Sequence, residues 1–438
     1  MKRSQTEINK ISKRYKKMGQ IEHCHERPDM YVGNTRPERI ETFLPDLKTF
    51  KFKSEIVHFS PAVGKIADEV LVNAFDNIQR KGSYTRRIDV SYNMDTGRIT
   101  VKNDGTTVPV VMHTEHNMYV PTMVFGHILT GENYDDKKQR LGGGRNGWGA
   151  KLTNIFSSEF TIRCVDAKNG LELTQKWENN MGTTAGPRVV KTQLKRDVTE
   201  VSFIPEWSRF KMQKMNRAYV KYITKRALEM AACSPKDVKV TLNGNDLPVN
   251  NLGDYTTLYT DKPITYLKVS KRWEVALFPT DEAVPMPSFV NGICTSRGGK
   301  HVDHAMGSVY KKLAEVATKK VKGIKVRPKD VSTFTNAIVS AFIVNPAFDS
   351  QTKETLKTPV AEFGSKCEWK PAHIKKITKS GILERVEAWA IAKAGKSLQK
   401  KIKAKSKLGI PKLYDANKAG TRPDESAKCT IILTEGDS

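Results

Sequence analysis

The sequence predicts an α+β protein of two or three domains, and three observations support this prediction. A chain of 438 residues is too long for a single compact core. Helical and strand patterns alternate from about residue 55 to 205, and a second α/β unit follows from about 265 to 350. The apolar share of 38% and the charged share of 28% are typical of globular proteins, and no apolar run is long enough to span a membrane.

The first unit is expected to contain a long helix followed by a hairpin. Apolar residues recur at every fourth position in 65–80, which predicts a helix with one buried face. The strand-like segments 87–92 and 98–102 flank Asp95-Thr96-Gly97, a sequence that favours a hairpin turn. Four more elements are expected in this unit: a strand at 160–165, a helix at 215–232, a strand at 238–242 and a turn at 243–246.

The second unit is expected to combine strands with one long helix. Its predicted elements are a strand at 273–278, a helix at 303–319 and an apolar strand at 334–344. Beyond Lys375 a lysine- and alanine-rich stretch predicts an exposed basic helix. A last apolar strand is predicted at 430–433. Because a domain does not end on its first strand, we expect the chain to be part of a longer protein.

The N-terminal 30 residues are polar and basic and lack the apolar core of a secretory signal, which predicts an exposed arm on an intracellular protein. The six cysteines are scattered and form no C-x-x-C pair, which argues against a zinc ribbon or a disulfide framework. His23-Cys24-His25 is similar to a ligand cluster, but no second pair stands at metal-site spacing. We therefore expect no metal there.

The charge balance favours a polyanionic partner. Lysine and arginine together number 74 against 47 acidic residues, a formal net charge of +27. Each phosphate that such a surface neutralises releases counterions, so nucleic acid is the expected partner. The alternative is a basic surface that serves solubility alone. Charge does not distinguish DNA from RNA.

One face of the predicted helix carries a row of polar residues. Glu69, Asn73 and Asp76 are spaced i, i+4 and i+7, so they lie together. This row suits a nucleotide site, because a glutamate can take a proton from an attacking water and an asparagine oxygen can hold Mg²⁺ between phosphates. A solvated surface has the same spacing, so both interpretations stay open.

Asn103-Asp104-Gly105 directly follows the second strand of the predicted hairpin. A polar side chain at a strand end can recognise an adenine amino group, and a glycine lets the ring approach the backbone. An ordinary Asx turn is the alternative.

The segment 141–151 reads LGGGRNGWGAK and precedes a predicted helix at 150–156. Glycines free backbone N–H groups to surround phosphate oxygens, and the following helix N-terminus adds a partial positive charge. Lys151 is placed to neutralise the terminal phosphate. No Ser or Thr follows this lysine, which disfavours a P-loop. The segment predicts phosphate binding, and a flexible surface loop is the alternative.

Taken in order, several long motifs resemble the ATPase region of eukaryotic type IIA DNA topoisomerases. They are IEHCHERPDMYVG, KIADEVLVNAFDN, NDG, YVPTMVFGHILTGENYDD, GGGRNGWGAKLTNIFS, NPAFDSQTKETL, FGSKC and TEGDS, and they extend from about Tyr15 to Ser438. The resemblance implies a Bergerat-type (GHKL) ATPase sandwich, as in gyrase, followed by a transducer α/β domain of ribosomal-protein-S5-like fold. The implied domains are an N-terminal arm (1–30), the ATPase domain (31–262), the transducer (263–390), a linker helix (391–428) and the start of a TOPRIM domain (429–438).

The resemblance implies ATP as the nucleotide, Mg²⁺ as its cofactor, and a role for each matching residue. Glu69 matches the general base, Asn73 the Mg²⁺ ligand, and Asn103 the adenine-reading residue, with Asp76 in the same pocket. The phosphate loop corresponds to Arg145, Asn146, Gly147, Trp148, Gly149, Ala150 and Lys151, and the family usually has Tyr in place of Trp148. The other implied contacts are Asn133 to ribose and phosphates, Gln351 and Lys353 from the transducer to the γ-phosphate, and Tyr15 to the nucleotide of a partner subunit.

Two departures from the family pattern concern the nucleotide. The family commonly reads N-D-G-x-G-I-P, where this chain has Thr107 and Val108 in place of the second glycine and the isoleucine. Since a β-branched residue disfavours positive φ, a different backbone is expected there. Thr130-Gly131-Glu132 replaces paired serines before Asn133, which puts a hydroxyl contact with phosphate in doubt.

The resemblance also implies partners. ATP would close a homodimeric gate around a DNA duplex, and hydrolysis would reopen it. Lys319, Lys320, Lys322 and Lys325 resemble the basic loop that senses DNA, with a solvated loop as the alternative. Glu435 matches a TOPRIM glutamate that helps hold the cleavage Mg²⁺, but its companion acidic residues and the nucleophilic tyrosine are missing. This chain is therefore not expected to cleave DNA by itself.

Two rival interpretations explain less of the sequence. A chaperone or histidine kinase of the same ATPase group does not explain Gln351-Thr352-Lys353 followed by 434–438. A non-enzymatic DNA-binding module, supported by charge alone, does not explain the glycine-rich segment. The short arm and the substitutions suit a viral enzyme in a host nucleus, viral factory or virion, and a cellular nuclear enzyme is the alternative.

Overall fold

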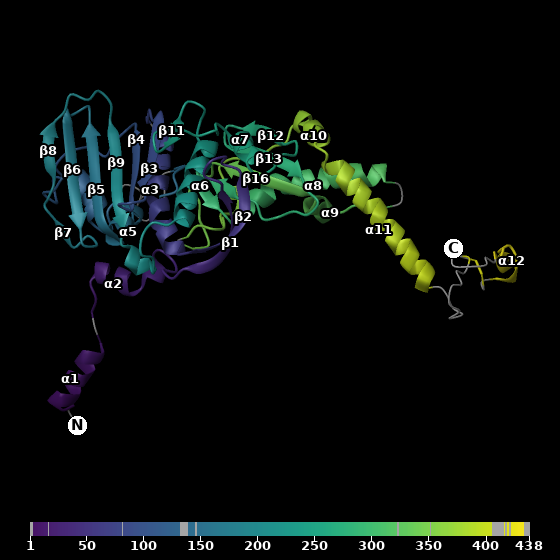
Figure 1. Ribbon diagram of the computed structural model, residues 1–438, viewed down its shortest axis with the longest axis horizontal. Coiled ribbons are helices and arrows are strands. Elements are labelled where there is room, and N and C mark those ends of the chain that lie inside the picture. The colour runs from purple at the N-terminus through teal and green to yellow at the C-terminus, as the bar shows by residue number, and fades with distance from the viewer. Residues whose placement is uncertain are drawn as a thin grey trace.

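The computed structural model of the chain describes residues 3–15, 17–80, 82–131, 139–144, 147–321, 324–350, 352–404, 416, 418–419 and 422–432, with the backbone alone described from 396 to 404. These residues form two adjoining α/β units (Figure 1). A short helix stands off at the N-terminal end, and a long helix reaches outward at the C-terminal end (Figure 1). The predicted α+β class is confirmed.

The first unit is built on a sheet that has nine strands in the described part of the chain. Its order is β11-β10-β3-β4-β9-β5-β6-β7, and β8 also pairs with β6. The bounds are β3 Arg87–Asn93, β4 Arg98–Asp104, β5 Ser157–Asp166, β6 Leu171–Glu178, β7 Thr183–Thr184, β8 Arg188–Lys191, β9 Val198–Pro205, β10 Lys239–Leu242 and β11 Asn245–Asp246. The expected hairpin is confirmed, because β3 and β4 pair antiparallel with Ile88 opposite Asn103. A separate hairpin joins β1 (Glu38–Pro45) to β2 (Phe52–Phe59).

Helices pack on this sheet and complete its core. α3 (Pro61–Gln79) contacts β4, α5 (Gly149–Ile155) and α6 (Arg217–Cys233). α3 begins four residues before the predicted helix. Proline has no backbone N–H, and the first residue of a helix does not need one, so Pro61 is well suited to that position. In the predicted apolar stripe, Ile66, Val70 and Ala74 are at most 5% exposed, whereas its last member, Ile78, is half-buried. The remaining helical segments of this unit are α4 Val120–Gly126, η2 Trp207–Phe210 and α7 Leu252–Thr257.

The second unit contains a sheet of five strands within the described residues, in the order β12-β13-β16-β14-β15. The strands are β12 Thr265–Ser270, β13 Trp273–Pro279, β14 Ser288–Val290, β15 Ile293–Thr295 and β16 Thr335–Ala341. The helices are α8 Lys300–Lys320, α9 Pro328–Thr333, η3 Val360–Glu362, α10 Pro371–Ile377 and α11 Ile382–Ala404. α8 packs on β16 and α11, and its buried Met306, Val309 and Leu313 belong to a second apolar core.

The two units are joined through apolar contacts and hydrogen bonds. Phe289 and Ile338 of the second unit belong to the core of the first. The rings of Phe75 and Phe342 stack across the junction with centroids 6.5 Å apart. The backbone N–H of Asn345 donates to the carbonyl oxygen of Arg140 at 3.1 Å, and the side-chain oxygen of Asn345 accepts from the N–H of Arg140 at 3.2 Å. This junction brings a loop of the second unit to the pocket described below.

The terminal segments differ in how they attach to the body. α1 (Gln5–Arg14) is capped by Ser4 and Glu7 and stands apart from the body (Figure 1). α2 (Gln20–Glu26) and the turn η1 (Pro28–Met30) lie against the first unit, and Cys24 is fully buried in its core. α12 (Pro423–Ser426) lies near the C-terminal end. Among the described residues, no helix is both long and apolar enough to cross a membrane.

The strand predicted at 430–433 is wrong for its described part, 430–432, which is not in a strand. Ile431 and Ile432 are 71% and 81% exposed. A β-strand needs backbone hydrogen bonds to a neighbouring strand, so the β-propensity of this apolar stretch does not by itself make a strand.

Candidate active site

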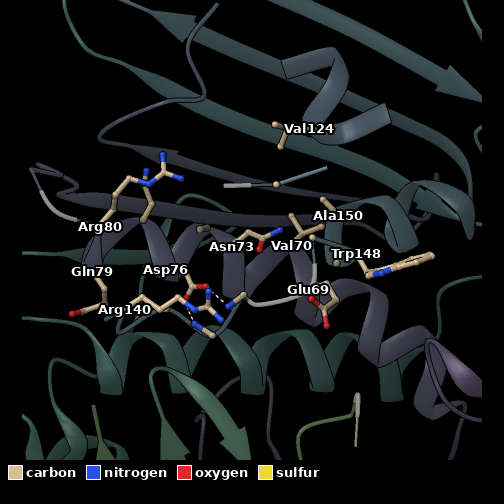
Figure 2. Close-up of a pocket in the computed structure, with 18 of the residues that line it drawn as sticks. Glu69, Val70, Asn73, Asp76, Gln79, Arg80, Val124, Arg140, Trp148 and Ala150 are labelled. Carbon is tan, nitrogen blue, oxygen red and sulfur yellow. Dashed lines mark hydrogen bonds between the residues drawn. The ribbon is translucent and has the colours of Figure 1, made fainter. Parts of the chain in front are cut away.

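A cavity of about 930 Å³ opens where the first unit meets the second. Its walls come from α3, the end of β4, α4, the glycine-rich segment with α5, and the loop after β16. Figure 2 labels lining residues from α3, α4 and α5. The predicted site residues that line it are Glu69, Asn73, Asp76, Asn103, Gly147, Trp148, Gly149, Ala150, Lys151 and Lys353. Residues scattered over most of the sequence therefore share one pocket.

Glu69 is buried at the base of this pocket and is 5% exposed. Its Oε1 forms an ion pair with Lys65, one helical turn earlier, and lies 3.6 Å from Nζ of Lys353. Burial alone would raise the pKa of Glu69, but the charges of Lys353 and Lys65 outweigh burial and lower the pKa to about 2. The carboxylate is thus firmly ionised.

Asn73 follows Glu69 by one turn of α3, and its side chain is exposed to the pocket. In Figure 2, Asn73 and Asp76 lie between Glu69 at one end and Arg80 at the other. The expected polar row on α3 therefore faces a cavity, which removes the alternative of a plain solvated surface.

Asp76 holds the glycine-rich segment. Its Oδ1 accepts a hydrogen bond from the backbone N–H of Gly143 at 2.8 Å, and its Oδ2 accepts one from Gly144 at 2.9 Å (Figure 2). Burial raises the pKa of Asp76 to about 6, although the two N–H donors oppose that rise. Sequence reasoning placed Asp76 in the pocket but did not foresee that it anchors this loop.

Asn103 is the last residue but one of β4 and is 4% exposed, with its Nδ2 donating to the carbonyl of Asp104 at 2.9 Å. Thr107 has no positive φ, so the backbone at this substitution has a conformation that a β-branched residue accepts. Its hydroxyl instead donates to the carbonyl of Val198 at 3.1 Å. The left-handed conformation falls on Gly105, with φ of 99°, where a Cβ would meet Thr85.

The side chain of Lys151 reaches the loop that follows α4. It is 3% exposed, and its ammonium donates to the carbonyl of Thr130 at 2.6 Å. Burial lowers the pKa of Lys151 to about 8. Trp148 caps α5, and its ring centroid lies 5.2 Å from that of Tyr31.

The second unit contributes Lys353 to the pocket. It lies on the loop after β16 with φ of 62°, and its side chain is 11% exposed. Burial opposes its charge, but the carboxylates of Glu69, Asp68 and Asp76 hold the pKa of Lys353 above its usual value. A lysine from one unit thus pairs with an acid from the other.

Several predicted residues lie elsewhere. Tyr15 is 72% exposed on the N-terminal segment and does not line the pocket. Lys319, Lys320 and Lys325 are exposed at the end of α8 and just beyond it, and Lys320 pairs with Glu387 at 2.9 Å. The remaining predicted residues lie outside the described residues: Asn133, Arg145, Asn146, Lys322, Gln351 and Glu435.

Sequence reasoning missed Lys65. This lysine is 6% exposed, and burial lowers its pKa although Glu69 opposes the change. The signal was present, because Lys65 precedes Glu69 by four positions within the predicted helix.

Comparison with known proteins agrees with this geometry. The family described as DNA gyrase B matches residues 217–406. DNA topoisomerase 2 of Bombyx mori is 42% identical over 445 residues, which cover 98% of this chain and 28% of that protein. The chain spans less than a third of the length of the curated relatives it matches.

Two solved structures match nearly over their whole length. The ATPase region of Saccharomyces cerevisiae topoisomerase II is 37% identical with a TM-score of 0.79, covering 86% of this chain and 99% of that one. The ATPase and transducer domains of DNA topoisomerase II from Balamuthia mandrillaris are 36% identical with a TM-score of 0.83, covering 88% and 99%. With this pocket, this fold and these matches, the chain belongs to the type II DNA topoisomerase family, in the part that forms its ATPase region.

Proposed function

We propose that this chain binds and hydrolyses ATP as the nucleotide-operated gate of a type IIA DNA topoisomerase. The observation that carries the proposal is the meeting of Glu69 and Lys353, from two different units, beside a glycine-rich segment in one pocket. An acid that can accept a proton and a cation that can sense a phosphate are the groups that ATP hydrolysis requires.

The walls suggest how ATP would lie. Asn103 stands at the end of β4 where the adenine would be recognised, and the backbone of Gly147 and Gly149 lies toward α5, where phosphates would meet freed N–H groups. Lys353 would then leave Glu69 for the γ-phosphate, which ties the second unit to the nucleotide.

In the hydrolytic step, a water oxygen attacks the γ-phosphorus while Glu69 takes its proton. The bond from the γ-phosphorus to the bridging oxygen breaks, and ADP leaves with that electron pair. Since phosphoryl transfer depends mainly on position and charge, Lys353 and Lys151 would both add electrostatic stabilisation.

The residues that line the pocket supply only some of the ligands that Mg²⁺ needs. Asn73 offers an amide oxygen to the pocket, and the described residues contain no group of three or more His, Cys, Asp or Glu side chains that could hold a metal ion. Magnesium commonly takes few protein ligands and completes its shell with phosphates and water, so Asn73 and the nucleotide would hold it together. The ion would neutralise phosphate charge.

The wider role is a proposal built on the relatives. Two copies would dimerise when ATP is bound, with Tyr15 of each arm reaching the nucleotide of the other. The closed dimer would capture a DNA duplex, and hydrolysis would loosen it. The net charge of +27 suits a sequence-nonspecific contact with double-stranded DNA. A nuclear site of action, or a viral one, would follow from this role.

The test compares the wild-type chain with Glu69→Ala, scoring steady-state ATP hydrolysis and dimerisation on the same samples. We expect the variant to dimerise with ATP and to lose nearly all turnover. Glu55→Ala serves as the control, because Glu55 pairs with Lys221 at 2.6 Å away from the pocket. If the wild type binds no nucleotide, the chain is a DNA-binding module and the proposal fails.

A further inference from the structure

Lys65 is a buried lysine that the hydrolytic step described above does not use. It lies on the first turns of α3, is 6% exposed, and forms its ion pair with Oε1 of Glu69. A buried ammonium without a partner loses its proton or destabilises the fold. If this lysine served only to stabilise the fold, an apolar residue of similar size would do so without the cost of burying a charge. Its pairing with Glu69 therefore indicates a further role.

The two oxygens of Glu69 have different surroundings. Both lysines approach Oε1: Lys65 from the same helix, and Lys353 from the second unit at 3.6 Å. Oε2 lies against Gly149, where an added Cβ would come within 2.3 Å of it. One oxygen is therefore held by cations, and the other faces the start of α5.

The two lysines stand on different elements of the fold. Lys65 is fixed by its position on α3, among residues buried in the first core. Lys353 lies on a loop of the other unit, in a left-handed conformation. If Lys353 moves to a phosphate, Glu69 loses one of its two counter-ions.

Among the described residues, only Lys65 and Lys353 pair with the Glu69 carboxylate. Lys151, on the neighbouring α5, donates to Thr130. Arg226, on the neighbouring α6, pairs with Asp68 and Glu229.

We propose that Lys65 is a positioning residue for hydrolysis: it keeps Oε1 of Glu69 in place after Lys353 has left, so that Oε2 stays directed at the attacking water. This inference rests on the proposed ATP hydrolysis. Lys353 serves as a removable partner of Glu69, and Lys65 serves as its permanent one. Nucleotide binding itself does not depend on Lys65.

The experiment uses the full chain and the variants Lys65→Met, Lys65→Arg, Glu69→Gln and Lys65→Met/Glu69→Gln. We expect Lys65→Met to lower kcat about 100-fold, because a misdirected carboxylate costs that much, with KM changed less than about threefold. Dimerisation with a non-hydrolysable ATP analogue should persist. Lys65→Arg should restore kcat to within about tenfold of the wild type, since it keeps the charge. The double variant should turn over no more slowly than Glu69→Gln alone, because the lysine acts only through the carboxylate.

The matched control is Lys221→Met, which removes a lysine that is 13% exposed and pairs with Glu55 on an outer strand. It should leave kcat and KM unchanged. An unaltered kcat in Lys65→Met, or a loss of kcat together with analogue binding, would overturn the inference while leaving the proposed function standing. A wild-type chain that does not hydrolyse ATP would instead overturn the proposed function.

Discussion

Oδ1 of Asp76 accepts a hydrogen bond from the backbone N–H of Gly143 at 2.8 Å, across a gap of 67 positions in the sequence. Its second oxygen accepts from the neighbouring Gly144. The carboxylate therefore sets where the glycine-rich segment lies relative to α3. A segment rich in glycine has many accessible conformations, and two hydrogen bonds to one buried acid restrict them.

Replacing Asp76 by Asn should weaken nucleotide binding about tenfold, or by about 1.4 kcal/mol, because an amide has one acceptor oxygen in place of two. Titration of a non-hydrolysable ATP analogue measures this loss. Asp46→Asn is the control, since Asp46 also accepts two backbone N–H bonds, from Lys48 and Thr49, but lies outside the pocket. Equal affinity in Asp76→Asn and the wild type would contradict the anchoring role.

The same pair of hydrogen bonds predicts a pH dependence. Burial raises the pKa of Asp76 from 3.8 to about 6, so the group gains a proton as pH falls through that value. One oxygen then becomes a donor, and one glycine N–H loses its acceptor. Analogue affinity of the wild type should fall below about pH 6, whereas that of Asp76→Asn should not change through this titration. Folding stability moves the other way: the raised pKa adds stability below pH 3.8, and this contribution is lost as pH rises through about 6.

Gly149→Ala should lower turnover about 100-fold. The new Cβ would lie 2.3 Å from Oε2 of Glu69, so the carboxylate has to move, and misplacement of a catalytic group by about 1 Å has an effect of that size. Gly149 has no positive φ, so backbone strain does not complicate the result. Gly307→Ala on α8 is the control, since a Cβ there meets nothing within 4 Å. Normal turnover in Gly149→Ala would show that Oε2 is not the working oxygen.

Lys353→Ala should abolish dimerisation driven by a non-hydrolysable ATP analogue. Without this ammonium, the second unit loses the charged one of its two proposed links to the γ-phosphate and keeps only Gln351, so nucleotide binding no longer joins the two units firmly enough to drive dimerisation. Sedimentation or light scattering with and without the analogue measures the effect. Lys357→Ala, an exposed lysine four positions further on, should dimerise as the wild type does. A Lys353→Ala chain that dimerises normally would rule out the sensor role.

The sequence predicted those elements whose cause is local. The helix over 65–80, the β3–β4 hairpin and the glycine-rich segment each follow from periodicity or turn chemistry within a short stretch. The row Glu69, Asn73 and Asp76 could be read because a helix fixes side chains at i, i+4 and i+7.

What escaped prediction depends on distant partners. Asp76 meets Gly143, and Lys151 meets the carbonyl of Thr130, only because the tertiary fold brings them together. The strand predicted at 430–433 is wrong over its described part, 430–432, for the opposite reason: the apolar residues there pair with no other strand in the described part of the chain. Lys65 could have been found from its spacing to Glu69, but its burial could not.

Neutralising the basic segment at the end of α8 should weaken the stimulation of ATP turnover by DNA. Lys319 and Lys325 are exposed, whereas Lys320 is already paired with Glu387 at 2.9 Å, so Lys320→Ala should have the smallest effect of the three. For each DNA phosphate that a variant no longer neutralises, the slope of log binding constant against log salt should become shallower by about 0.9. Changing the exposed lysines Lys168, Lys191 and Lys195 to Ala is the control, because they lie at the far edge of the first sheet. Equal DNA stimulation in both sets of variants would show that the α8 lysines are an ordinary solvated surface.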